Sequence, residues 1–151
     1  MKKVVSVGRL PKDLKIVLVG GCFDILHPGH IIFLQKAKKE GDILLVLLES
    51  DEKKRRLKGQ GRPVHTQKER AKVLSALRVV DYIILLPYLE NDSQYDRLVG
   101  KIKPDVIAAT FGDVNISHYQ RAAKLTGAKL KFVTKKISNY SSSRILNGTV
   151  Q

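Results

Sequence analysis

The stretch GGCFDILHPGH, residues 20–30, stands between an apolar run at residues 16–20 and a segment of helical spacing that begins after Pro28. Gly20 and Gly21 permit close backbone approach or unusual φ angles, and proline suits the first turn of a helix. The stretch therefore predicts a strand, a tight glycine loop and a helix N-terminus. Free N–H groups and the helix dipole make such a place favourable for a phosphate group.

The same alternation of strand and helix continues outward along the chain. Near-continuous aliphatic runs predict five strands buried on both faces, at residues 16–20, 43–48, 82–86, 106–109 and 130–133. Helical patterns lie between and after them, at residues 30–37, 66–77, 93–102, 116–125 and 142–146. This order predicts an α/β fold, a doubly wound parallel five-stranded sheet of Rossmann-like form. Ligands bind to such sheets at the carboxyl ends of the strands.

Length, charge and cysteine content narrow the class of protein. The 151 residues predict a single domain, 1–151, in which residues 1–14 form an N-terminal extension. The apolar runs are too short for a membrane span, and no signal-peptide pattern is found, so we expect no membrane partner. Cys22 is the only cysteine, which excludes an internal disulfide and favours a cytoplasmic setting. The net charge of +14 predicts anionic partners.

His27 and His30 flank Pro28-Gly29 at the predicted helix N-terminus. Two imidazoles there could donate hydrogen bonds to a phosphate as its charge shifts, and the amides of Cys22 and Phe23 could donate as well. The alternatives are structural histidines, a metal pair or chance. The spacing of the two histidines directly after a Gly-Gly strand end favours phosphate chemistry.

These residues resemble the HxGH nucleotidyltransferase superfamily, also called the cytidylyltransferase-like family. Its G-T/C-F-D-x-x-H-x-G-H signature reads here as Gly21-Cys22-Phe23-Asp24 and His27-Pro28-Gly29-His30. A second family motif, S-S/T-S/T-x-I, reads as Ser141-Ser142-Ser143-Arg144-Ile145. Within the superfamily, the segments GCFDILHPGHIIFLQKAKKEGD, LKGQGRP and ERAKVLSALRVVDYII resemble the heptose-1-phosphate adenylyltransferase domain of lipopolysaccharide core biosynthesis proteins. Glycerol-3-phosphate cytidylyltransferases and archaeal FAD synthetases are similar as well.

The resemblance implies a role for each motif residue. His27 and His30 would stabilise the transition state at the α-phosphate, and Lys58 would be a catalytic-site lysine. The expected nucleotide-binding residues are Gly21, Cys22, Phe23, Asp24, Gly29, Arg70, Gly112, Asp113, Ser141, Ser142 and Ser143. Mg²⁺ would arrive with ATP and be held mainly by the triphosphate, with Asp24 as a protein partner.

Two of these positions, and the basic run before Lys58, also have simpler interpretations. Arg70 could be an ordinary ion pair on a helix surface, and Asp113 could be only a helix N-cap. The basic run at residues 53–56, which precedes Lys58, is predicted mainly as a solvated surface. His65 and His118 have no motif support, so we expect them to be structural or surface residues.

The leading hypothesis is an adenylyltransferase that joins AMP from ATP to a phosphorylated small molecule, such as heptose 1-phosphate, and releases pyrophosphate. The alternatives are a glycerol-3-phosphate-type cytidylyltransferase and an FAD synthetase. Lys136 stands where the cytidylyltransferase branch has arginine, which favours ATP over CTP. A basic nucleic-acid-binding module is a hypothesis of another class, but aromatic residues are only 6% of the chain. A nucleotide-binding regulator without turnover is a third. The resemblance also implies a homodimer.

Overall fold

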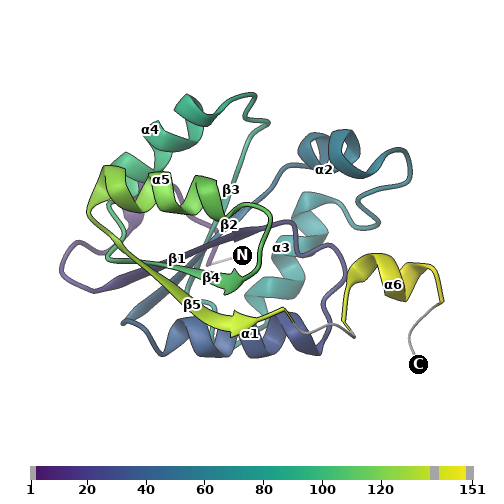
Figure 1. Ribbon diagram of the computed structural model, residues 1–151, viewed down its shortest axis with the longest axis horizontal. Helices are drawn as coiled ribbons and strands as arrows, with labels where there is room; N and C mark the ends of the chain where they lie inside the picture. The colour runs from purple at the N-terminus through teal and green to yellow at the C-terminus, as the bar shows by residue number, and fades with distance from the viewer. Residues whose placement is uncertain (1–2, 137–139, 149–151) are drawn as a thin grey trace.

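The fold is a parallel sheet of five strands in the computed structural model, which describes residues 3–136 and 140–148 (Figure 1). The strand order is β3-β2-β1-β4-β5. The strands are β1 (Ile16–Gly21), β2 (Ile43–Leu48), β3 (Tyr82–Leu85), β4 (Val106–Phe111) and β5 (Lys129–Lys135). The predicted α/β fold and all five predicted strands are therefore confirmed. Chain progression reverses between β1 and β4, so the glycine loop after β1 lies at the switch point where such sheets bind ligands.

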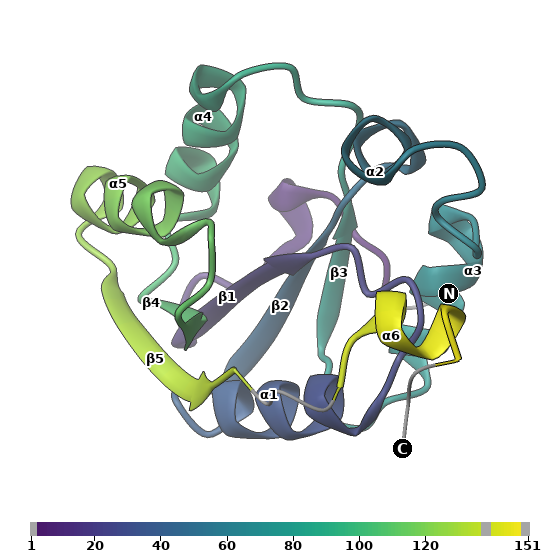
Figure 2. The ribbon, with the colours of Figure 1, turned by 45° about the vertical axis from the view of Figure 1, so that its right-hand side comes forward.

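Helices cover both faces of the sheet, as Figure 2 shows. On one face, α1 (Pro28–Lys38) and α3 (Gln67–Ser75) pack over Val17 and its neighbours. On the other face, α4 (Asp92–Ile102) and α5 (Ile116–Thr126) pack over Leu18 and its neighbours. Successive residues of a strand point to opposite faces, so continuous aliphatic runs supply both cores.

One helix, α2 (Asp51–Lys58), was missed by the sequence patterns. Ser50 caps it by accepting a hydrogen bond from the backbone N–H of Lys53, at 3.2 Å. Asp51 and Glu52 in the first turn and basic residues in the last turn complement the helix dipole. The basic run therefore lies on a helix that begins three residues after β2 ends, at the ligand-binding edge of the sheet.

The N-terminal segment is part of the packed domain. Val5 donates to the carbonyl of Ile83 and Ile83 donates to that of Lys3, at 3.0 and 2.8 Å, so this segment pairs with the outer edge of β3. Leu10, after the short 3-10 helix η1 (Val7–Arg9), is buried in the same core as Leu18. Most of the predicted extension thus belongs to the fold. Among the described residues, no helix combines the length and hydropathy needed to cross a bilayer.

Candidate functional site

Three aromatic rings form a stack at the N-terminus of α1. His27 is the N-cap residue of this helix, and its ring lies 3.8 Å from the ring of His30, nearly parallel to it at 20°. The ring of Tyr140 lies 5.9 Å from that of His27, at 16°. Gly29 leaves room for this arrangement, because a Cβ there would lie 3.0 Å from the His27 ring. The signature histidines are therefore held side by side by the helix turn and by Gly29.

Both histidines are held in the neutral form at neutral pH. Burial lowers the pKa of His27. Burial also lowers the pKa of His30 to about 4, helped by the charge of Lys54 and by the cost of placing two protonated imidazoles side by side. The nearby carbonyl of Ile25 acts in the opposite direction on His30. The Nδ1 atoms of both rings are buried and find no hydrogen-bond partner among the described residues. Polar atoms left without partners suit a ligand that supplies them.

Phe23 fixes the shape of the glycine loop. Its φ angle is +48°, a backbone conformation that residues other than glycine rarely adopt. The centre of its ring lies 5.3 Å from that of the His30 ring. A Cβ on Gly21 would lie only 2.9 Å from the Phe23 ring. The glycine at this position therefore permits the turn that brings β1 to the histidines.

A cavity of about 440 Å³ joins the two sequence motifs. Its walls include the glycine loop, the histidine stack, the end of β4 and the start of α6 (Ser142–Leu146). Ser142 Oγ donates to the carbonyl of Ile25 at 3.1 Å, which ties α6 to the loop before the histidines. The predicted site residues that line this cavity are Gly21, Cys22, Phe23, His27, Gly29, His30, Gly112, Asp113, Ser141, Ser142 and Ser143.

Asp113 lies on the cavity wall, and its interpretation as a helix N-cap is wrong, because Asn115 is the N-cap residue of α5. Its Oδ1 accepts a hydrogen bond from the N–H of Asn115 at 2.8 Å, just before α5, so it stabilises the turn that starts this helix. The residue also lines the cavity beside Gly112, whose φ of +84° favours glycine. Thr110, two residues before Gly112, also lies on the cavity wall, and its hydroxyl is 2.9 Å from that of Thr134, which the sequence patterns did not indicate.

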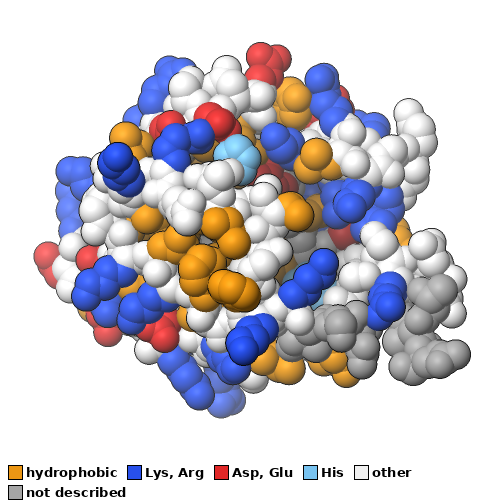
Figure 3. Space-filling model, viewed as in Figure 1, with side chains coloured by type: hydrophobic (Ala, Val, Ile, Leu, Met, Phe, Trp, Pro, Cys, Tyr) orange, Lys and Arg blue, Asp and Glu red, His pale blue; other side chains and the backbone are white. Residues whose placement is uncertain are grey.

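A second cavity, of about 320 Å³, lies on the other side of the end of β1, between α2, α4 and α5. The predicted residue Lys58 lines this second cavity and is absent from the lining of the first. Both cavities are lined by residues 20–22, Lys54 and Tyr119. Two ligands bound in the two cavities would therefore meet beside the end of β1. Figure 3 shows the hollowed face with Lys and Arg side chains around the hollow.

Lys54 is the functional candidate that the sequence patterns missed. It lies on α2, one turn before Lys58, which places both side chains on the same side of that helix. Burial lowers the pKa of Lys54, and its charge in turn lowers that of His30. The sequence signal for Lys54 was its spacing of four residues from Lys58, which places two side chains on one side of a helix. This signal could be used only if residues 51–58 had been predicted as a helix.

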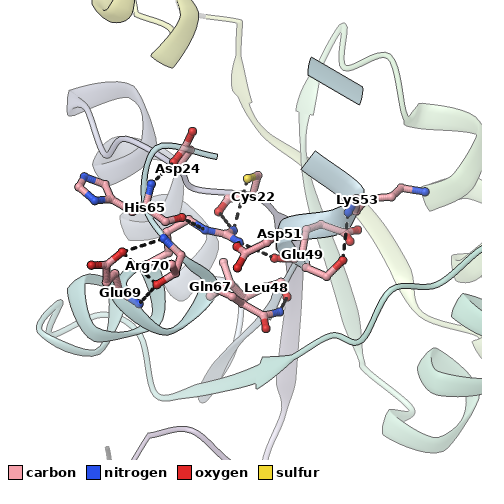
Figure 4. A network of polar contacts seen from close by, with 12 residues as sticks. Cys22, Asp24, Leu48, Glu49, Asp51, Lys53, His65, Gln67, Glu69 and Arg70 are labelled. Atoms are coloured by element: carbon pink, nitrogen blue, oxygen red, sulfur yellow. Dashed lines mark hydrogen bonds and ion pairs between the residues drawn. The ribbon is translucent and has the colours of Figure 1, made fainter. Parts of the chain in front are cut away.

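Asp24 and Arg70 line neither cavity and belong instead to a network of polar contacts, which Figure 4 shows. The carboxylate of Asp24 accepts hydrogen bonds from Arg62 Nε at 2.9 Å and from the backbone N–H groups of Val64 and His65. Burial acts to raise the pKa of Asp24, but these bonds outweigh it and lower the pKa. Asp24 therefore fixes the loop between α2 and α3.

Arg70 is buried, and its guanidinium is fully used by protein groups. It donates to the carbonyl of His65 at 3.0 Å, to the carbonyl and sulfur of Cys22 at 2.6 and 3.3 Å, and to Asp51 at 2.7 Å. A further bond, of 2.9 Å, goes to the carbonyl of Glu49. These contacts give Arg70 a positioning role that neither interpretation of the sequence had assigned to it. Burial also raises the pKa of the Cys22 thiol.

The described residues contain no cluster of three or more His, Cys, Asp or Glu side chains able to hold a metal ion. Asp24 is occupied by Arg62 and two backbone donors, which leaves Asp113 as the motif carboxylate on the wall of the first cavity. This donor set fits a Mg²⁺ ion that is coordinated mainly by phosphate oxygens and gains one carboxylate from the protein.

Comparisons with known proteins agree with the fold and with the family that the sequence resembles. The family model described as Cytidylyltransferase-like matches residues 18–148. A relative named Bifunctional protein HldE, from Wolinella succinogenes, is 50% identical over 93 residues, which cover 62% of this chain and 19% of that protein. Another with this name, from Nitratiruptor sp., is 42% identical over 112 residues, 71% of this chain and 23% of that protein. The matched part is thus about a fifth of these relatives.

Two solved structures are also similar. The lipopolysaccharide core biosynthesis protein from Thermoplasma volcanium is 32% identical with a TM-score of 0.63, and the match covers 85% of this chain and 99% of that one. A pantoate-beta-alanine ligase from Francisella tularensis has a TM-score of 0.67 at 20% identity, over 93% of this chain and 67% of that one. The second likeness shows the fold alone.

Proposed function

The chain belongs to the cytidylyltransferase-like family, and we propose that it is a nucleotidyltransferase that transfers AMP from ATP to a sugar 1-phosphate, such as heptose 1-phosphate, and releases pyrophosphate. The likeness to a lipopolysaccharide core biosynthesis protein supports this class of acceptor. The observation that carries the proposal is the meeting of two cavities at residues 20–22 and Lys54, beside the signature histidines.

In this proposal the nucleoside triphosphate binds in the first cavity and the acceptor in the second. An oxygen of the acceptor phosphate forms a bond to the α-phosphorus, and the bond from that phosphorus to the oxygen shared with the β-phosphate breaks. The acceptor oxygen is already anionic, so no strong base or covalent nucleophile is required. Catalysis then depends on positioning and on stabilisation of charge at the α-phosphate.

The residues at the junction have separate tasks in this scheme. His27 and His30 are neutral, and each imidazole keeps one N–H that can donate to a phosphate oxygen. Lys54 supplies positive charge between the two phosphates, and Lys58 attracts the acceptor phosphate. The hydroxyl groups of Ser141 and Ser143 donate hydrogen bonds to the triphosphate from the other wall, and Ser142 holds this segment in place through its bond to Ile25. Mg²⁺ bound to the triphosphate would neutralise part of its charge, and Asp113 would be its protein partner.

ATP is proposed over CTP because Lys136, rather than an arginine, stands on the wall of the first cavity. A lysine carries the charge but lacks the planar pair of donors that can read a base edge. A cytoplasmic setting, where ATP is available, and a homodimer stay predictions from the sequence.

A panel of substrates tests the proposal. The protein is incubated with ATP or CTP, Mg²⁺ and one acceptor from heptose 1-phosphate, mannose 1-phosphate, glycerol 3-phosphate and FMN, and pyrophosphate release is followed. The expected result is release with ATP and a sugar 1-phosphate, and a loss of at least about 10²-fold in turnover for His30→Ala. If the protein turned over only CTP with glycerol 3-phosphate, or only ATP with FMN, the proposed substrates would be wrong and these would take their place. Unchanged turnover in His30→Ala would reject the proposed site.

A further inference from the structure

The second cavity contains a carboxylate that is not part of any ion pair among the described residues. Asp92 and Asp96 line the same cavity, and both are bound by Arg121, at 2.6 and 3.2 Å. Glu49 also lines it, and its carboxylate accepts hydrogen bonds from the hydroxyl of Tyr95, with the backbone N–H of Ser50 as a further neighbour. Glu49 is therefore the carboxylate of this cavity whose charge no described cationic side chain pairs with, and its remaining lone pairs can accept hydrogen bonds.

Glu49 is held in place from three directions. Its backbone N–H donates to the carbonyl of Gly21 at 3.0 Å, and its carbonyl accepts from Arg70 at 2.9 Å, as Figure 4 shows for the second contact. The hydroxyl of Tyr95, on α4, donates to the two carboxylate oxygens at 2.8 and 3.0 Å. The side chain thus bridges the end of β2 and the opposite wall of the cavity. A binding group fixed in this way loses little entropy when a ligand arrives.

The surroundings of the Glu49 carboxylate favour a ligand that offers it uncharged hydrogen-bond donors. Burial raises the pKa of Glu49, and the bond from Tyr95 and the charge of Lys53 oppose this effect in part. The ammonium group of Lys53 lies 5.5 Å from the centre of the Tyr95 ring. A cationic ligand at Glu49 would meet this like charge, whereas hydroxyl groups would supply the missing hydrogen bonds without repulsion.

The rest of the cavity fits the remainder of such a ligand. Leu47 and Val99 give it apolar walls against which a carbon skeleton can lie. Lys54 and Lys58 supply positive charge for a phosphate group at the side that adjoins the first cavity. A molecule with one anionic end and several hydroxyl groups would satisfy both ends of the cavity at once.

We propose that Glu49, oriented by Tyr95, determines acceptor specificity by accepting hydrogen bonds from hydroxyl groups of a polyhydroxylated phosphate ester. This inference rests on the proposed function, because it assigns the second cavity to the acceptor. Tyr95 is a positioning residue, since it acts through the carboxylate that it holds.

The test compares Glu49→Gln and Tyr95→Phe with the unaltered protein in binding and in turnover. Binding of heptose 1-phosphate, mannose 1-phosphate and their singly deoxygenated analogues is measured by calorimetry with a non-hydrolysable ATP analogue present. KM values for the acceptor and for ATP are measured separately. Asp13→Asn is the matched control, because Asp13 is exposed and precedes the amino end of β1, far from the cavities.

Glu49→Gln is expected to weaken acceptor binding roughly 10- to 100-fold, the usual range for a hydrogen bond to a charged group, while KM for ATP and the Tm stay nearly constant. Tyr95→Phe should produce a smaller change in the same direction. At least one deoxy analogue should bind worse than its parent to the unaltered protein and equally to Glu49→Gln. This last pattern is expected if Glu49 binds a hydroxyl group of the acceptor, and not if Glu49 only connects β2 to α4.

The two proposals fail in different ways. Sugar-phosphate binding that depends on Glu49 but gives no AMP transfer would overturn the proposed function alone. AMP transfer with an unchanged acceptor KM in Glu49→Gln, or equal losses for acceptor, ATP and Tm, would overturn the inference about Glu49. If no polyhydroxylated phosphate of the panel binds, both are overturned.

Discussion

His30 is buried in its neutral form, so the protein should become less stable as the pH falls below 6.5. In the folded chain the pKa of His30 is lowered from 6.5 to about 4 by burial and by neighbouring positive charges. The unfolded chain therefore binds a proton more readily than the folded one below pH 6.5. Stability contributed by this residue is present above pH 6.5, is lost as the pH falls, and stops changing near pH 4.

The size of the effect follows from the two pKa values. At pH 5 the unfolded histidine is mostly protonated and the folded one mostly neutral, which costs about 2 kcal/mol of unfolding free energy relative to pH 7. His30→Gln removes the titrating group and keeps a polar side chain. The unaltered protein should lose about 2 kcal/mol more between pH 7 and pH 5 than His30→Gln does.

Urea unfolding at both pH values, followed by circular dichroism, measures this difference. His65→Gln is the matched control, because His65 is exposed, and it should repeat the pH dependence of the unaltered protein. Equal pH dependence in the unaltered protein and in His30→Gln would mean that His30 titrates alike in the folded and unfolded states, and that its burial has no effect on stability.

Three further substitutions probe separate parts of the site. Lys54→Met should lower kcat by roughly 10²-fold, because it removes positive charge between the two cavities, whereas Lys68→Met on the exposed side of α3 should leave steady-state kinetics unchanged. Arg70→Met should lower the unfolding free energy by about 3 to 5 kcal/mol in urea titrations, and a loss below about 1 kcal/mol would argue against its positioning role. Ser142→Ala removes the bond to Ile25 and should raise KM for ATP about fivefold, which an unchanged KM would contradict.

The sheet could be predicted because each of its strands contains a run of aliphatic residues that is easily found in the sequence. Parallel strands covered on both faces need continuous aliphatic runs, and β2 (Ile43–Leu48) consists of nothing else. Helix α2 was missed for the opposite reason, since Leu57 is its one apolar residue and leaves no hydrophobic period to detect. Its support comes from the Ser50 cap and from charge placement along the helix.

The motif residues lie together as the ordered motifs suggested, but the contacts of individual side chains depend on the fold. Arginine is rarely buried, and the partners of Arg70 lie at residues 22, 49, 51 and 65, which only strand pairing brings together. Tyr140 belongs to no motif, and its place beside His27 follows from the path of the chain before α6. Lys54 needed a helix that the patterns did not reveal.

Transfer of labelled phosphate shows which bond of ATP the protein cleaves and which group it moves to the acceptor. The protein is incubated with Mg²⁺, heptose 1-phosphate and ATP that carries ³²P at either the α- or the γ-position, and the products are separated by chromatography. The α-label is expected to move into a nucleotide-linked sugar while the γ-label appears in pyrophosphate, and His30→Ala should slow both by at least about 10²-fold. Release of the γ-label as inorganic phosphate, with the α-label remaining in ADP, would show cleavage at the wrong phosphate and contradict the account.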